Sequence, residues 1–88
     1  MTYSVIFVGD AERSLAKLDK GIQLRILKKV AQLERSDFES RHLHHGSPYF
    51  VEEVGGYRIA FEVDEMSLTK TIYFVGDHKQ YEHWYSSQ

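Results

Sequence analysis

The spacing of apolar residues divides the first 33 residues into a strand and a helical region. Residues 2–8 are mostly β-branched and aromatic and stop at Gly9-Asp10, which predicts a strand followed by the start of a helix. From there to Leu33, apolar residues recur every three or four positions, as on one side of a helix. They are Ala11, Leu15, Leu18, Ile22, Ile26, Leu27, Val30 and Leu33. Asp19 and Gly21 interrupt this stripe and predict a helical hairpin with its turn at residues 19–21, although one kinked helix fits the same spacing.

The second half of the chain predicts a loop and then three strands. Residues 35–47 are polar, hold three of the five histidines and end in Gly-Ser, just before Pro48, which predicts a loop. Strand-like runs follow at residues 49–54, 57–64 and 69–75, and the short breaks between them predict an antiparallel meander.

The middle strand has two distinct faces. Its apolar row is Tyr57, Ile59, Phe61 and Val63, and its other row is Arg58, Ala60, Glu62 and Asp64. Because side chains alternate across a strand, one face is expected to meet the helices and the other to stay open for a ligand.

The predicted element order, β-α-α-β-β-β, shows no internal repeat or linker. It predicts a single α+β domain over residues 1–88, in which a small twisted antiparallel sheet carries the N-terminal helical hairpin on one face. The tail, residues 76–88, follows the last predicted strand directly. It is rich in His, Lys, Tyr and Trp, so these side chains are expected at the end of that strand.

Composition narrows the function classes. The chain has no cysteine, which excludes disulfides and cysteine-based zinc sites and fits a reducing compartment. It has no apolar run of about 20 residues and no signal-like N-terminus, so we expect a cytoplasmic protein without a membrane partner. The net charge of −2 gives the whole molecule no basic field, and RNA binding would therefore need a local patch.

Three segments, AERSLAKLD, GYRIAFEVD and IYFVGDHKQYEHWY, taken with this element order, resemble the RelE/ParE superfamily of toxins from type II toxin–antitoxin pairs. The resemblance covers almost the whole chain and is greatest to the RelE-like ribonuclease branch. It implies a metal-independent mRNA endoribonuclease that inhibits translation without a cofactor. Most such proteins act in the ribosomal A site, so the implied partners are mRNA, the ribosome and a cognate antitoxin.

The resemblance also implies a site. Arg58 matches the family's strand arginine, and His78, Lys79 and Tyr81 or Tyr85 match its basic and aromatic tail positions. Metal-free RNA cleavage needs a base, an acid and a cation at the phosphate. A guanidinium suits the cation and an imidazole suits proton transfer. The expected catalytic residues are Arg58, His78 and Tyr81, and the expected RNA-binding residues are Lys79, Tyr85 and Arg41.

The same residues also fit purely structural roles. Arg58 can pair with Glu62 or Asp64 on its own strand face, and the tail aromatics can serve only to anchor the tail. His42, His44 and His45 suggest a metal site, but their spacing fits no standard zinc motif, so we predict no metal here.

Two features depart from the family pattern. The run before Gly-Tyr-Arg holds Glu52 and Glu53 where ribosome-dependent members carry lysines, and the isoelectric point is near 6.2. These two features favour one alternative, a catalytically silent binding module with the same fold. A ParE-like inhibitor of DNA gyrase, which would share the fold, also stays open.

Overall fold

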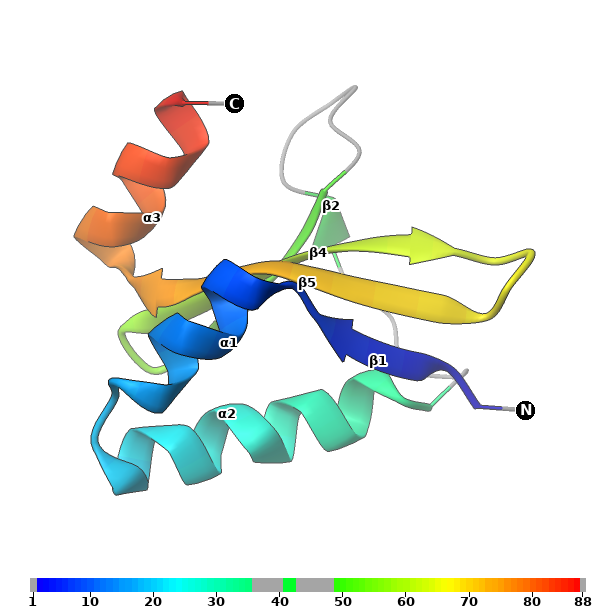
Figure 1. Ribbon diagram of the computed structural model, residues 1–88, viewed down its shortest axis with the longest axis horizontal. Helices are drawn as coiled ribbons and strands as arrows, with labels where there is room; N and C mark the ends of the chain where they lie inside the picture. The colour runs from blue at the N-terminus through cyan, green and yellow to red at the C-terminus, as the bar shows by residue number, and fades with distance from the viewer. Residues whose placement is uncertain (1, 36–40, 43–48, 88) are drawn as a thin grey trace.

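The computed structural model describes residues 2–35, 41–42 and 49–87, which form a mixed sheet with three helices (Figure 1). The elements are β1 Ser4–Phe7, α1 Gly9–Ala16, α2 Lys20–Leu33, β2 Arg41–His42, β3 Phe50–Val54, β4 Tyr57–Asp64, β5 Thr69–Asp77 and α3 His78–Ser86. Over the described residues the sheet has five strands in the order β1-β5-β4-β3-β2. The predicted α+β class and the order β-α-α-β-β-β are confirmed.

The sheet is mixed, whereas the sequence predicted an antiparallel one. β3, β4 and β5 form the expected antiparallel meander, but β1 lies parallel to β5, with Ser4 opposite Thr69 and Phe7 opposite Ile72. The helical hairpin connects β1 to the rest of the chain, and so β1 can join the edge of the sheet in the same direction as β5. The short strand β2 at the other edge, which falls in the predicted loop, was not expected.

The helical hairpin is confirmed, and its turn lies slightly earlier than predicted. α1 ends at Ala16 and α2 begins at Lys20, so Gly21 lies inside α2 and does not end α1. The side chain of Gln23 donates hydrogen bonds to the carbonyls of Leu15 and Ala16 at 3.0 and 3.1 Å. These bonds supply acceptors at the end of α1 with a donor from α2, and they fix the two helices together.

One face of the sheet packs on α1 and α2, as the apolar row of β4 predicted. Ile59 and Phe61 of β4 are fully buried there, together with Ile26 and Leu33 of α2. Side chains of this size each stabilise a fold by about 1.5–3 kcal/mol when fully buried. This aliphatic cluster is the main core, and we call this side the helical-hairpin face.

The other face is not open as predicted, because α3 covers part of it. Asp77 caps this helix: its carboxylate accepts a hydrogen bond from the Gln80 N–H at 2.8 Å, and the Gln80 side chain accepts one from the Asp77 N–H at 2.9 Å. Tyr81 of α3 then packs on Ala60 and Phe74 in a second, smaller cluster. We call this side the α3 face. None of the helices among the described residues is long and apolar enough to cross a membrane.

Candidate functional site

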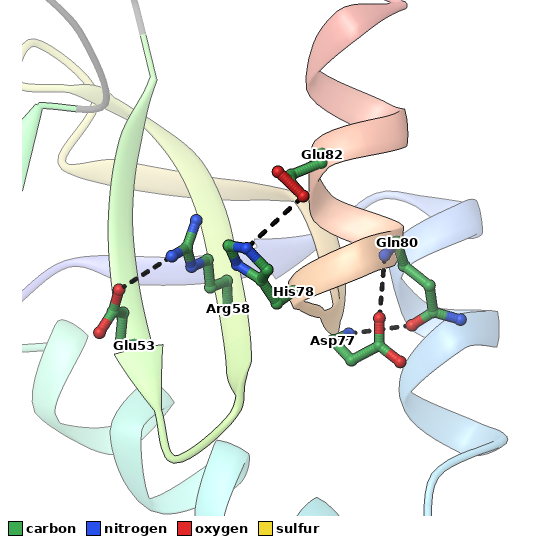
Figure 2. Close-up of polar contacts among 6 residues, drawn as sticks. All are labelled: Glu53, Arg58, Asp77, His78, Gln80 and Glu82. Atoms are coloured by element: carbon green, nitrogen blue, oxygen red, sulfur yellow. Dashed lines mark hydrogen bonds and ion pairs between the residues drawn. The ribbon is translucent and has the colours of Figure 1, made fainter.

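Arg58 lies on the α3 face, near the end of the sheet where β3 turns into β4. In the register of the sheet it lies between Glu53 of β3 and Gly76 of β5. Its guanidinium carbon is 4.8 Å from the centre of the Tyr81 ring, and its Nη2 is 3.3 Å from Oε1 of Glu53. Figure 2 shows the Arg58 side chain between Glu53 and His78. The arginine is thus held by a ring beneath it and a carboxylate beside it.

Gly76 allows α3 to start close to Arg58. A Cβ atom at this position would lie 2.7 Å from Cζ of Phe74 and 2.8 Å from Oε1 of Gln80, too close for either contact. The Phe74 ring and the capping side chain therefore occupy the space that any other residue would need. Gly76 thereby brings the first turn of α3 against the strand that carries Arg58.

Tyr81 is buried beneath Arg58. Only 4% of the residue is exposed, and its ring packs edge-on against Phe74 with the centroids 5.7 Å apart. The hydroxyl is buried and has no hydrogen-bond partner among the described residues. Burial raises the pKa of Tyr81, and the Arg58 charge offsets part of this rise. Tyr81 can therefore orient Arg58, but its hydroxyl is enclosed by protein.

His78 is the first residue of α3 and lies near Arg58 on the surface. Its side chain is 58% exposed, and Nε2 is 3.5 Å from Oε1 of Glu82, one turn further along the helix. This contact holds the imidazole against the first turn of α3. Arg58, Tyr81 and His78 are thus brought together at the start of α3.

Lys79 lies on a different side of α3. It borders a groove of about 660 Å³ between α1 and α3, together with Asp10, Trp84 and other residues. Tyr85 is partly buried and its ring stacks on that of Tyr81, with the centroids 6.3 Å apart. Only the backbone of Arg41 is described, where it pairs with Val51. Lys79 therefore borders the α1–α3 groove, whereas Tyr85 contacts the ring that holds Arg58, and the side chain of Arg41 lies outside the described part of the structure.

The alternative in which Arg58 pairs with Glu62 or Asp64 on its own strand is not what the structure shows. Glu62 accepts a hydrogen bond from the Tyr73 hydroxyl, which raises the pKa of Tyr73. Hydrogen bonding from the Ser67 side chain, and then from the backbone N–H groups of Ser67 and Met66, lowers the pKa of the Asp64 carboxyl group. The partner of Arg58 is Glu53, on the neighbouring strand.

The sequence held a signal for this pair. A two-residue hairpin turn at Gly55-Gly56 places Val54 opposite Tyr57, and hence Glu53 opposite Arg58. Glu52, one residue earlier, points to the other face, where its carboxylate lies 3.7 Å from Nζ of Lys29. The acidic run in β3 therefore serves both faces, and only Glu53 affects the site.

Sequence reasoning also missed an aromatic surface beside the site. The Tyr49 ring lies 5.1 Å from Trp84 and 5.7 Å from Tyr73, and Trp84 stacks on Phe74 at 5.3 Å. Trp84 was considered only as a tail anchor, and its packing on the sheet agrees with that role. The helical spacing of Tyr81, Trp84 and Tyr85 was the signal available in the sequence.

The prediction for the histidine loop lies largely outside the described residues. Only the backbone of His42 is described, and His44 and His45 lie outside the described residues. Within the described part of the chain, no group of three or more His, Asp or Glu side chains is arranged to hold a metal ion.

Comparison with known proteins identifies the fold. No protein-family model matches the chain, and no curated protein matches it. Among solved structures, a mutant of the Escherichia coli toxin RelE in the free state has a TM-score of 0.79 and 21% identity, covering 96% of this chain and 92% of that chain.

Two complexes show the same similarity. The RelBE toxin–antitoxin complex of Mycobacterium tuberculosis has 26% identity and a TM-score of 0.64, with 89% of this chain and 93% of that chain covered. The archaeal RelE–RelB complex of Pyrococcus horikoshii has 24% identity and a TM-score of 0.71, with 88% and 96% covered. The chain therefore has the fold of the RelE toxins, as its sequence resemblance implies.

Proposed function

We propose that this protein is the toxin of a type II toxin–antitoxin pair and that an antitoxin protein inhibits it. Support comes from the RelE fold over almost the full chain, and from similar structures solved as toxin–antitoxin complexes. The short chain, the mixed sheet and the Gly-Tyr-Arg strand all agree with this assignment.

The activity that the site supports best is metal-independent cleavage of mRNA that is bound to the ribosome. The observation that carries this proposal is the position of Arg58, held on the Tyr81 ring and next to an exposed histidine at the start of α3. A guanidinium can bind two phosphate oxygens at once and stays charged throughout the reaction. Arg58 is the cation of the site, and Tyr81 is its positioning residue.

His78 supplies proton transfer in this proposal. In the cleavage step, a base removes the proton of the 2′-hydroxyl, the 2′-oxygen bonds to phosphorus, and the bond to the 5′-oxygen breaks. An acid then delivers a proton to the departing oxygen. An exposed imidazole can play either part, and the contact with the Glu82 carboxylate orients its ring.

Glu53 is an inhibitory group in this arrangement. Its carboxylate occupies part of the guanidinium edge that a phosphate would use. Because Glu53 is 66% exposed, the pair contributes only about 0.2–1 kcal/mol. A phosphate can therefore displace it. The same pairing also supports a silent binding module, in which Arg58 never contacts RNA.

The test is an in vitro cleavage assay with a defined mRNA, ribosomes and EDTA. Arg58→Ala should lower the cleavage rate by about 10²- to 10³-fold, because the phosphate loses its fixed cation. Arg13→Ala, which removes an exposed arginine that pairs with Asp10 on α1, is the matched control and should leave the rate unchanged. Circular dichroism should show both variants folded.

Three outcomes separate the candidate functions. Growth arrest with mRNA cleavage supports the ribonuclease. Growth arrest with DNA damage and intact mRNA indicates a gyrase inhibitor, and an absence of arrest indicates the silent module. If EDTA stops cleavage, the metal-independent mechanism is wrong.

A further inference from the structure

A groove of about 660 Å³ runs between α1 and α3, and the cleavage step proposed above does not use it. One wall is a stripe of α1 that includes Asp10 and Ser14. The other wall is a stripe of α3 that includes Lys79 and Trp84, and β5 contributes Phe74 to the lining. Both helices contact β5 (Figure 1). The volume lies within the range of about 300–1,000 Å³ that is typical of ligand-binding clefts.

The groove exists because β1 is shorter than β5. β1 pairs with β5 only as far as Phe7 opposite Ile72, whereas β5 continues to Asp77. Beyond that point α1 lies beside β5 in place of a strand, and its side chains in the lining include the small residues Ala11 and Ser14. These small side chains leave open the space that larger residues would fill.

The aromatic part of the lining is held in place by neighbouring rings. Trp84 stacks on Phe74 with the ring centroids 5.3 Å apart, and it meets Tyr49 edge-on at 5.1 Å. Tyr73 also lines the groove, and both Tyr73 and Trp84 are only partly buried. A ligand in the groove therefore meets fixed aromatic side chains, on which the base of a nucleotide can stack.

The charges around the groove favour a ligand with an anionic group. Lys79 borders it and forms no ion pair with a described residue. Glu82, the acidic residue of α3, lies on another side of the helix beside His78 (Figure 2). On the opposite wall, Asp10 pairs with Arg13, so its negative charge is offset within α1. Lys79 is thus the charge that a ligand in the groove would meet first.

This combination of a cation and aromatic rings distinguishes between classes of ligand. A simple anion would use Lys79 but would gain nothing from the rings. An aliphatic side chain would cover the rings but would leave the cation without a partner. A nucleotide carries both complementary groups, because its phosphate suits a lysine and its base suits an aromatic surface.

We propose that the α1–α3 groove is a nucleotide-binding site, in which the base lies against Trp84 and the phosphate lies at Lys79. The ligand is a nucleoside monophosphate unit, either free or as one residue of a single-stranded RNA. The site lies on a different side of α3 from Arg58 and His78, so the inference goes beyond the proposed cleavage and does not depend on it.

The experiment uses the fluorescence of Trp84, which is the only tryptophan of the chain. The protein carries Arg58→Ala, so that a phosphate bound at the cleavage site does not contribute to the signal. AMP should quench the fluorescence with a Kd of about 10 µM to 1 mM, and calorimetry should give the same value. Adenosine should bind about 3- to 10-fold more weakly, because it lacks the phosphate.

Two lysine variants test the position of the phosphate. Lys79→Ala should weaken AMP binding by about 3- to 10-fold and leave adenosine binding unchanged, so that the preference for AMP over adenosine disappears. Lys28→Ala removes an exposed lysine on α2, away from the groove, and is the matched control. It should bind AMP within twofold of the parent.

Two phenylalanine variants test the position of the base. Ser14→Phe places a ring in the groove and should weaken the binding of both AMP and adenosine by more than about tenfold. Glu12→Phe introduces the same ring at an exposed position of α1 that does not line the groove, and it should bind both ligands as the parent does. Circular dichroism should show both variants folded.

A five-nucleotide RNA, A5, separates the two sources of the ligand. If A5 binds more than about tenfold tighter than AMP and Ser14→Phe removes this gain, the groove takes a nucleotide of an RNA chain. If A5 binds no better than AMP, the groove takes a free nucleotide. Both results support a nucleotide site.

Three results would overturn the inference. The first is the absence of AMP binding, and the second is equal AMP binding by the Ser14→Phe and Glu12→Phe variants. The third is binding of inorganic phosphate as tightly as AMP, which would indicate a simple anion site at Lys79. None of these results affects the proposed function, which is tested by mRNA cleavage with the protein that retains Arg58.

Discussion

The two faces of the sheet are built differently. The helical-hairpin face is an aliphatic core, in which Ile59 and Phe61 of β4 meet buried residues of α1 and α2. The α3 face is aromatic, with Phe74 and Tyr81 at its centre and charged groups around it. Both faces belong to the same strands, and alternate residues of β4 serve each of them.

Because of this difference, one face mainly determines the stability of the fold and the other carries the residues proposed to cleave RNA. A continuous aliphatic core can be changed only at the cost of the fold, because close-packed interiors tolerate little change in volume. The α3 face leaves a buried hydroxyl without a partner in the part of the chain that the structure describes, and it keeps Arg58 and His78 partly accessible. We therefore expect substitutions on the first face to act on unfolding, and those on the second to act on activity.

The largest effect is expected from the histidines of α3. His78→Ala should lower mRNA cleavage by about 10²- to 10⁴-fold, because it removes a group proposed to transfer protons. His83→Ala is the matched control, since His83 is an exposed histidine of the same helix on the side that borders the α1–α3 groove. Equal rates for the two variants would remove His78 from the mechanism. Sensitivity at His44, in the predicted loop, would move the active site there.

The next largest effect is expected on the free energy of unfolding, which we compare between one substitution on each face. Phe61→Ala should lower the free energy of unfolding by about 3–5 kcal/mol, because it empties a fully buried position in the main core. Trp84→Ala should cost less, because Trp84 is only partly buried and lies over the sheet surface. Urea unfolding of both variants measures this directly. A larger loss at Trp84 would show that α3 is an essential part of the core.

A smaller effect is expected from the buried hydroxyl of Tyr81. Tyr81→Phe removes a polar atom that has no described partner, so stability should stay level or rise by about 1 kcal/mol. The ring remains beneath Arg58, and cleavage should be nearly unchanged. A rate loss comparable to that of Arg58→Ala would instead show that the hydroxyl takes part in the reaction, as the sequence first suggested.

The smallest effect concerns the one charged residue buried on the helical-hairpin face among the described residues. Lys70 is 4% exposed and lies over the Tyr3 ring; burial lowers its pKa, an effect that Glu52 partly offsets. As the pH rises through this lowered pKa towards 10.5, Lys70 loses its proton in the folded protein but keeps it in the unfolded chain. The folded state then no longer contains a buried charge, and the free energy of unfolding rises.

The parent should therefore gain stability relative to Lys70→Met over that pH range, by about 1.4 kcal/mol for each unit by which the pKa is lowered. Thermal unfolding of both proteins from pH 7 to 10.5 measures the difference. A difference that stays constant with pH would show that Lys70 has an ordinary pKa in the folded state.

The sequence predicted the helical-hairpin face well, because its pattern is local. The apolar row of β4 and the stripe of α1 and α2 each follow from spacing alone, and Phe61 and Ile26 are buried as expected. The parallel pairing of β1 with β5 was not predictable in this way. The pairing depends on the direction in which the chain leaves the helical hairpin, and the local sequence pattern does not determine this direction.

The α3 face was predicted only in part. Arg58 and His78 both lie near the start of α3 (Figure 2), and their roles stay predictions, but the sequence pattern did not indicate that the tail is a helix. Its nine residues include several with weak helix propensity, among them His, Tyr, Trp and Ser. Asp77 followed by Gln80 three residues later was a usable capping signal, and it was overlooked. Without the helix, the burial of Tyr81 could not be anticipated.

The pairing of β1 with β5 also bears on how the protein folds. Ser4 and Thr69 are adjacent in the sheet but 65 residues apart in the chain, whereas β3, β4, β5 and α3 follow one another with short connections. Closing a long loop costs entropy before any contact compensates for it, so we expect the meander to form first and β1 to join last. Substitutions in β4 should then slow folding, while substitutions in β1 should mainly speed unfolding. β4, which carries Arg58, would then pair with β3 and β5 before β1 joins the edge of the sheet.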